Sequence, residues 1–111
     1  MKIKKLSEAK PYEAPNHRNC TSLRLIGPGD GARTFSVGLS HFLPGGGAGP
    51  DASPLERTYT ILAGDLTLIV GGEEVVLKRL DTCYIGPGET REIVNRGNEI
   101  VTMLVAVAAP A

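Results

Sequence analysis

The sequence predicts an all-β protein, built as a sandwich or a barrel, and three observations lead to this fold class. Short runs rich in Val, Ile, Leu, Thr and Tyr recur along the 111 residues. Turn signals such as Gly27-Pro28-Gly29 and Gly71-Gly72 separate these runs. No stretch of useful length keeps the apolar period of a helix. A chain of this length buries a single core, so we expect one all-β domain.

The first part of the chain is predicted to form an arm followed by a strand. Residues 2–6 are expected to be a short edge strand, and Pro11 and Pro15 punctuate the loop that follows it. Residues 21–26 are expected to form the next strand. The glycine- and proline-rich segment 27–31 ends that strand.

Apolar and polar residues alternate between residues 34 and 43. Phe35, Val37 and Leu39 share one face of this predicted half-buried strand, and His41 is in phase with them. We therefore expect His41 to point inward. Residues 44–54 are dense in glycine and proline, and this composition predicts a loop.

The second half of the chain is predicted to consist of strands joined by tight turns. Residues 57–70 favour strand, with a kink at Gly64-Asp65, and Gly71-Gly72 is typical of a hairpin turn. The other strands are expected at residues 74–77, 82–85, 91–94 and 100–107. Glycine-containing turns at residues 86–88 and 96–98 separate the last three.

Composition bounds the function. Twelve basic and twelve acidic residues leave a net charge of about zero, which gives no reason to expect nucleic acid or an anionic membrane as partner. No apolar run approaches the roughly 20 residues that a membrane span needs. The N-terminus has lysines but no apolar signal region, so we expect a cytoplasmic protein. In that reducing compartment Cys20 and Cys83 should be free thiols, and Cys83 is expected to fill space in the core.

Two segments carry a recognisable spacing. The segment from Gly45 to Gly64 keeps the spacing of the pattern Gly, five residues, His-x-His, three or four residues, Glu, six residues, Gly, although other residues stand at the His and Glu positions. Starting at Leu80, the pattern Gly, five residues, Pro-x-Gly, two residues, His, three residues, Asn passes Gly88 and closes on Asn95. Both spacings resemble the two motifs of the cupin superfamily.

The resemblance implies a double-stranded β-helix, the cupin jelly roll, with a short N-terminal arm. It implies a barrel core over residues 34–107, preceded by an arm and first strand over residues 1–33 and followed by a tail over residues 108–111. Gly45, Gly64, Gly88 and Asn95 take the structural positions of the motifs. The family's tendency to form homodimers implies a homodimer here, and we expect Leu62, Leu66 and Leu68 to offer the interface, unless they pack within the sandwich.

The metal-ligand positions of the motifs hold other residues. Asp51 and Ser53 stand where the first motif has its histidines, Arg57 stands for the glutamate, and Arg91 for the histidine of the second motif. A guanidinium group supplies no lone pair to a metal. We therefore expect no metal and no other cofactor.

Strand alternation extends the inward-facing set. If Arg57 faces inward, Tyr59 and Ile61 do as well, and the same parity turns Arg91, Ile93 and Asn95 inward. Two arginines in one pocket form a good fork for a carboxylate. The expected partner is therefore a small carboxylate-bearing molecule, bound by Arg57 and Arg91 with Asp51 and Ser53 nearby.

Two functions follow from this pocket. The first is a metal-free isomerase, epimerase or lyase, in which His41 or Tyr59 moves a proton next to the carboxylate held by the arginines. Metal-free cupins that epimerise sugars are the family precedent for acid and base chemistry in this barrel. The second is a binding or accessory protein without catalysis.

Each residue also has a structural explanation. Arg57 and Arg91 could pair with the neighbouring Glu56, Glu89 and Glu92 at the rim. Asp51 could cap a turn, and Ser53 could stabilise one. A register shift would place Glu56 inside, where His41, Asp51 and Glu56 would form an irregular metal site. His17 could act only if its segment folds over the barrel mouth.

Overall fold

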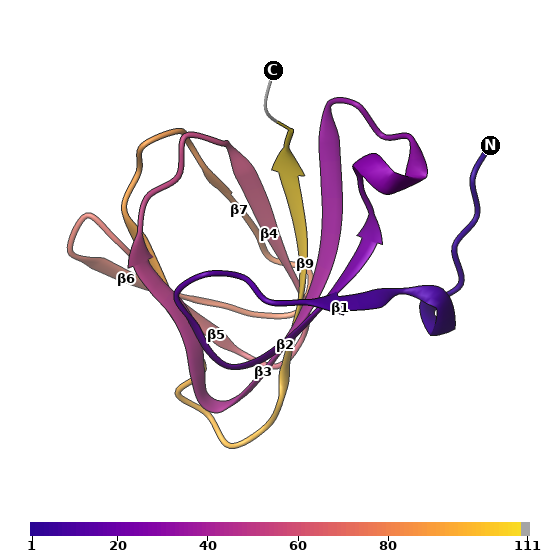
Figure 1. The fold of residues 1–111 in the computed structure, drawn as a ribbon. Coiled ribbons are helices and arrows are strands. Elements are labelled where there is room, and N and C mark those ends of the chain that lie inside the picture. The colour runs from indigo at the N-terminus through magenta and orange to yellow at the C-terminus, as the bar shows by residue number, and fades with distance from the viewer. Residues whose placement is uncertain (110–111) are drawn as a thin grey trace.

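The computed structural model describes residues 1–109, and it is built almost entirely of strands (Figure 1). Two short 3-10 helices accompany the strands, and the elements in chain order are η1 (Leu6–Glu8), β1 (Lys10–Tyr12), β2 (His17–Ile26), η2 (Pro28–Asp30), β3 (Phe35–Asp51), β4 (Arg57–Ala63), β5 (Leu66–Val70), β6 (Glu73–Leu77), β7 (Thr82–Ile85), β8 (Arg91–Val94) and β9 (Val101–Ala108). None of the helical segments in the described chain has the length and apolar character to cross a bilayer.

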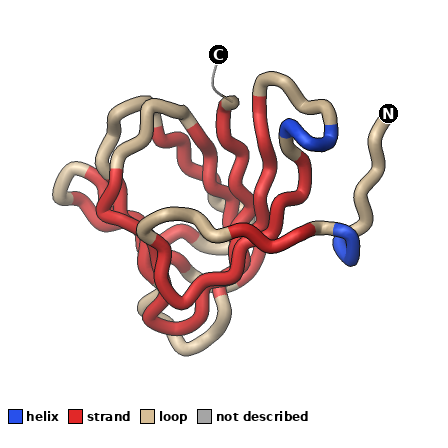
Figure 2. The backbone as a smooth tube through the Cα atoms, viewed as in Figure 1, coloured by secondary structure: helices blue, strands red, loops and turns tan. Residues whose placement is uncertain are grey.

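The strands form one nearly closed antiparallel sheet, as expected for a jelly roll. The strand order is β6-β5-β8-β3-β9-β4-β7, and β2 adds to β3 and carries β1 on its other side. The 17-residue β3 joins the two halves of the barrel, because its first part pairs with β9 and its last part with β8. Figure 2 shows the strands joined by loops and turns, with helix confined to two short segments.

The glycine run after Pro44 is part of β3, so the loop predicted for residues 44–54 is wrong as far as Asp51. Gly47 lies opposite Val94 and Ala48 opposite Ile93 in the ladder with β8. A Cβ on Gly47 would collide with the backbone carbonyl oxygen of Ile93. Glycine therefore lets two strands approach closely here. Composition alone cannot distinguish a glycine run of this kind from one that forms a loop.

The arm also differs from the prediction. The edge strand expected at residues 2–6 is not formed, and β1 lies further along the chain at Lys10–Tyr12, where Lys10 pairs with Arg24. Strand β2 begins at His17 rather than at residue 21. Both boundaries are set by pairing with segments distant in sequence, which local propensity does not report.

The C-terminal tail is shorter than predicted. Ala108 is the last residue of β9 and lies opposite Phe35, and the Ala109 amide donates to the carbonyl of Thr34. The remainder of the predicted tail, residues 110–111, lies outside the described residues.

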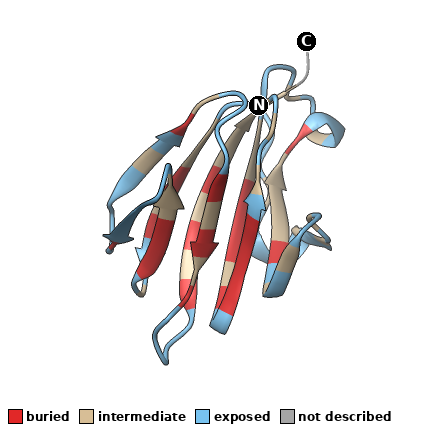
Figure 3. Cartoon of the chain, turned by 90° about the vertical axis from the view of Figure 1, so that its left-hand side faces the viewer, coloured by how far each residue is buried: buried red, intermediate tan, exposed pale blue. Residues whose placement is uncertain are grey.

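The core lies between the two halves of the sheet, where buried residues gather on the strands (Figure 3). Its largest fully buried members are Phe42, Ile61, Leu66, Ile93, Met103, Val101 and Asn95. Leu66 and Leu68 are therefore core residues, and the expectation that they form an exposed dimer interface is wrong. Leu62 is the only one of the three expected interface leucines that is exposed.

Asn95 fixes the turn after β8 from inside the core. Its side-chain Nδ2 donates to the carbonyls of Phe42 at 3.0 Å and Glu99 at 2.7 Å, and its Oδ1 accepts from the Gly97 amide at 3.0 Å. The Asn95 side chain is only 1% exposed and its bond to Phe42 is buried, so water cannot replace it at that carbonyl, whereas Gly97 and Glu99 lie at the exposed end of the turn.

The Asn95→Ala variant should lose about 1–3 kcal/mol of unfolding free energy, because it leaves the buried carbonyl of Phe42 without its partner and removes two further bonds in the turn. Asn98→Ala, in the same turn at an exposed position, is the matched control and should stay within about 0.5 kcal/mol of the wild type. Urea denaturation followed by circular dichroism measures both. Equal effects in the two variants would contradict this role for Asn95.

Candidate functional site

A cavity of about 960 Å³ opens into the barrel, and the N-terminal arm closes one side of it. Residues of the arm, including Tyr12 and Pro15, line it together with residues of β3, β4, β8 and β9. Its volume is that of a site for a drug-sized or smaller molecule. The polar residues at its inner end, from four different strands, are His17, Ser40, Asp51, Arg57, Tyr59 and Arg91.

Strand alternation on β4 and β8 is confirmed by burial. Tyr59 and Ile61 are buried while Thr60 and Leu62 are not, and Arg57 and Tyr59 line the cavity. On β8, Arg91 and Ile93 are buried, and the flanking Glu92 and Val94 are partly exposed. The inward orientation predicted for both arginines is therefore correct.

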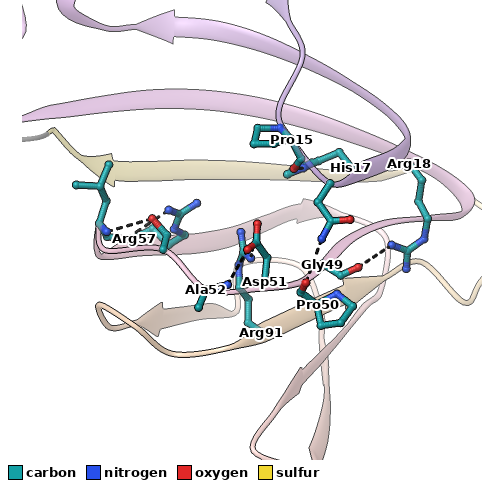
Figure 4. A network of polar contacts seen from close by, with 12 residues as sticks. Pro15, His17, Arg18, Gly49, Pro50, Asp51, Ala52, Arg57 and Arg91 are labelled. Carbon is teal, nitrogen blue, oxygen red and sulfur yellow. Dashed lines mark hydrogen bonds and ion pairs between the residues drawn. The ribbon is translucent and has the colours of Figure 1, made fainter.

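Arg91 is the most constrained group of the cavity. Its guanidinium Nε donates to the Tyr59 hydroxyl at 3.0 Å. Its Nη1 lies 3.9 Å from Asp51 Oδ2, and Figure 4 shows these two side chains close to each other. The Arg91 side chain is 6% exposed, and Nη1 is buried with no hydrogen-bond partner among the described residues. A buried charged donor that makes no hydrogen bond lowers the stability of the fold by at least about 1–3 kcal/mol. A ligand acceptor placed at Nη1 would remove this cost.

The rim ion pairs considered as an alternative for the two arginines are not formed. Glu92 accepts from Arg18 at 3.3 Å, and Glu89 accepts from the Gly86 amide at 2.6 Å. Glu56 accepts from the Tyr84 hydroxyl at 3.0 Å.

Arg57 lines the cavity, and its guanidinium group contacts the chain just before β4. Its Nη2 donates to the carbonyl of Leu55 at 3.3 Å, and its side chain is partly exposed. The guanidinium group therefore keeps further donors for a ligand.

Asp51 and Ser53 combine structural and cavity positions. Asp51 Oδ1 accepts from the Ala52 amide at 2.9 Å, and Ser53 Oγ accepts from the Leu55 amide at 3.1 Å. These contacts are the turn-forming roles expected of both residues. Both side chains also line the cavity, with the Asp51 carboxylate turned toward Arg91.

His41 lies on the outer face of the sheet, so its predicted inward orientation is wrong. Ser40 lies opposite Met103 and both line the cavity, whereas His41 lies opposite Thr102 and its Nδ1 is 3.2 Å from the Thr102 hydroxyl. The apolar face of this strand is its outer face, and small or polar residues face the cavity. Ser36 and Ser40 line the cavity, and Phe42, which has the same parity, is fully buried, so the run of apolar residues at positions 35, 37 and 39 did not mark the inner face.

The irregular metal site is also not formed. Asp51 faces the cavity, His41 faces outward, and Glu56 is exposed at its contact with Tyr84. Within residues 1–109, no three His, Cys, Asp or Glu side chains are grouped to hold a metal ion.

His17 is the cavity histidine. It begins β2 opposite Ala48, and its ring stacks on Phe42 with centroids 6.2 Å apart and planes 20° apart. Burial, the largest cause, lowers the pKa of His17, and the charges of Arg91 and Arg57 lower it further. The arm folds over the barrel. This is the condition that we set above for His17 to act in the site.

Cys83 packs against the core, as expected of a filler. Burial raises the pKa of its thiol, so the thiol is protonated at neutral pH and is a poor nucleophile.

The titration of His17 tests this geometry. Arg91→Met removes a nearby positive charge that disfavours the imidazolium, so the His17 pKa should rise toward its ordinary value. Proton NMR of the imidazole signals against pH measures it, and with only two histidines in the chain the His41→Asn variant assigns the spectrum. Arg96→Met removes an exposed arginine that pairs with Glu74 and should leave the titration unchanged. An unchanged His17 pKa in Arg91→Met would contradict the arrangement.

Comparisons with known proteins agree with the fold. Residues 38–107 match the family model described as Cupin domain. Over 111 residues the chain is 40% identical to the Beta-D-galactosidase Rv1717 of Mycobacterium tuberculosis, covering 99% of this chain and 96% of that protein. It is 34% identical over 88 residues to the Tetracenomycin polyketide synthase protein TcmJ of Streptomyces glaucescens, covering 77% of this chain. The match spans 59% of that second relative's length.

Among solved structures, the polyketide cyclase RemF from Streptomyces resistomycificus superposes with a TM-score of 0.89. The superposition covers 99% of this chain and 80% of RemF, at 22% sequence identity. At that identity the likeness establishes the barrel architecture and not the chemistry.

Proposed function

The chain belongs to the cupin family, and from this premise we propose that its barrel cavity binds a small organic acid through Arg57 and Arg91 without a metal ion. The single observation that carries the proposal is the buried Nη1 of Arg91, which makes no hydrogen bond within residues 1–109 and has the Asp51 carboxylate only at 3.9 Å. A ligand carboxylate placed there would accept the missing hydrogen bond. It would also meet a guanidinium group already oriented by Tyr59.

The donor set supports an anion over a cation. Two guanidinium groups offer donors only, and each would repel a divalent ion by about 4 kcal/mol per unit-charge pair at ~4 Å with an effective dielectric near 20. Asp51 supplies one carboxylate against two arginines, so the inner end of the cavity keeps an excess of positive charge. This excess favours a ligand that carries negative charge.

Tyr59 adds a further donor. Because a guanidinium cannot accept, the Tyr59 oxygen accepts from Arg91 Nε and its own proton is left to donate. If the protein is an isomerase, epimerase or lyase, Tyr59 and His17 are the groups placed to move a proton next to the bound carboxylate. A binding protein without catalysis would use the same contacts.

A second candidate function is hydrolysis of a β-galactoside. The observation that favours it is the full-length match to a protein named as a beta-D-galactosidase. Among the described residues that line the cavity, the carboxylates are Glu8, Asp30 and Asp51, and Asp30 pairs with Lys4 at 2.7 Å. Glycosidases generally use two carboxylates, so this reading depends on Asp51 with Glu8 as its partner.

Binding of acids is tested by thermal unfolding with acetate, pyruvate, malonate, succinate and citrate. A bound acid at about 100 times its Kd should stabilise the fold by about 2.7 kcal/mol. Arg57→Met and Arg91→Met should lose this stabilisation, and Arg96→Met should keep it. If no acid in the series stabilises the wild type, the organic-acid proposal fails.

The galactoside candidate is tested by hydrolysis of nitrophenyl β-D-galactopyranoside. If it is correct, the wild type releases nitrophenol, and Asp51→Asn loses most of the rate because one carboxylate of the pair becomes an amide. Glu99→Gln, which changes an exposed carboxylate outside the cavity, should leave the rate unchanged. Hydrolysis that persists in Asp51→Asn would exclude this site as its source.

A further inference from the structure

Among the described residues, His17 is the one imidazole in the lining of the cavity, and two contacts fix its position and orientation. Its ring lies nearly parallel to that of Phe42, and its Nδ1 lies 2.8 Å from the carbonyl oxygen of Pro15. Both contacts come from segments that also hold the cavity, β3 and the arm. The imidazole is therefore held against rotation beside the site.

The contact with Pro15 determines which ring nitrogen carries the proton. A carbonyl oxygen only accepts, so Nδ1 must donate. In the neutral ring the lone pair is then on Nε2. Within residues 1–109, Nε2 makes no hydrogen bond to the protein.

The surroundings keep this ring neutral. Burial is the largest cause that lowers the His17 pKa, and Arg91 and Arg57 lower it as well. The hydrogen bond to Pro15 and the charge of Asp51 act in the opposite direction, and the pKa remains below its ordinary value of 6.5. At neutral pH the ring therefore presents an acceptor.

This acceptor stands among donors. Arg57, Arg91 and Tyr59 all offer hydrogens toward a ligand. Asp51 is the other acceptor at this end, but its Oδ1 is occupied by the Ala52 amide and its Oδ2 faces Arg91. A ligand that satisfies every group therefore needs an anionic acceptor for the arginines and a donor for Nε2.

We propose that Nε2 of His17 accepts a hydrogen bond from a hydroxyl group of the ligand, so that the cavity selects a hydroxy acid over the same acid without the hydroxyl. This inference rests on the proposed binding of an organic acid at Arg57 and Arg91 and adds the chemical class of that acid. A ligand that covers Nε2 removes this half-buried acceptor from water, so an analogue that lacks the hydroxyl leaves it unpaired and should bind less tightly.

The test compares matched pairs of acids by isothermal titration calorimetry at pH 7.5. The pairs are malate against succinate and lactate against propionate, which differ by one hydroxyl group. The wild type should bind the hydroxy acid of a pair at least about tenfold more tightly. His41→Phe, which changes the histidine on the outer face, should keep this preference.

Two variants at His17 assign the preference to Nε2. His17→Phe keeps a ring against Phe42 and lacks the acceptor, so the ratio of the two affinities should fall to about one while the deoxy acid still binds. His17→Gln retains a side-chain oxygen acceptor and should restore part of the preference. Circular dichroism and the melting temperature check that each variant is folded.

The outcomes of these titrations distinguish the hydroxyl contact from the proposed binding of organic acids. If both acids of a pair bind the wild type equally, or if His17→Phe keeps the preference, the hydroxyl contact is wrong and binding of organic acids stands. If none of the four acids binds the wild type, the organic-acid function fails and the inference fails with it. A preference in the wild type that is lost only in His17→Phe supports the inference.

Discussion

The structure of this site depends on one guanidinium group buried in the wall of a barrel. Arg91 is oriented by the Tyr59 hydroxyl at 3.0 Å, and its Nη1 faces Asp51 at 3.9 Å without making a hydrogen bond in the described chain. A fold that keeps such a group accepts a cost in stability. Binding of an anionic ligand would offset this cost. The guanidinium group also contributes positive charge to the cavity.

The backbone around the second motif keeps the turn expected of the family, although residues of the motif differ in this chain. Leu80 occupies the glycine position of the second motif and still has a φ of 69°, in the left-handed region that favours glycine. Its amide donates to Ile61, which holds the turn. Asn95 ties the same region to β3 through Phe42. The barrel architecture is thus formed by a chain that carries other residues at several motif positions.

The sequence by itself determined the all-β class, the positions of the later strands and the inward orientation of β4 and β8. These features follow from local information, because side chains alternate strictly along a strand and glycine pairs mark hairpin turns. On β8 the alternation was sufficient to place Arg91 inside. The spacing of the two motifs then indicated the barrel, even though no metal ligand of those motifs is present.

Only the tertiary structure decided which histidine belongs to the site and where the glycine-rich segment lies. On β3, alternation defines two faces but not which of them is interior, and in the fold the face of Ser40 and Phe42 is the inner one, which leaves His41 outside. His17 reaches the cavity because β2 pairs with Ala48, thirty-one positions away in the sequence. The glycines near Gly47 lie in a strand because a neighbouring backbone approaches them too closely for a Cβ. Each of these outcomes depends on contacts between segments remote in sequence, and for that reason no local pattern contains them.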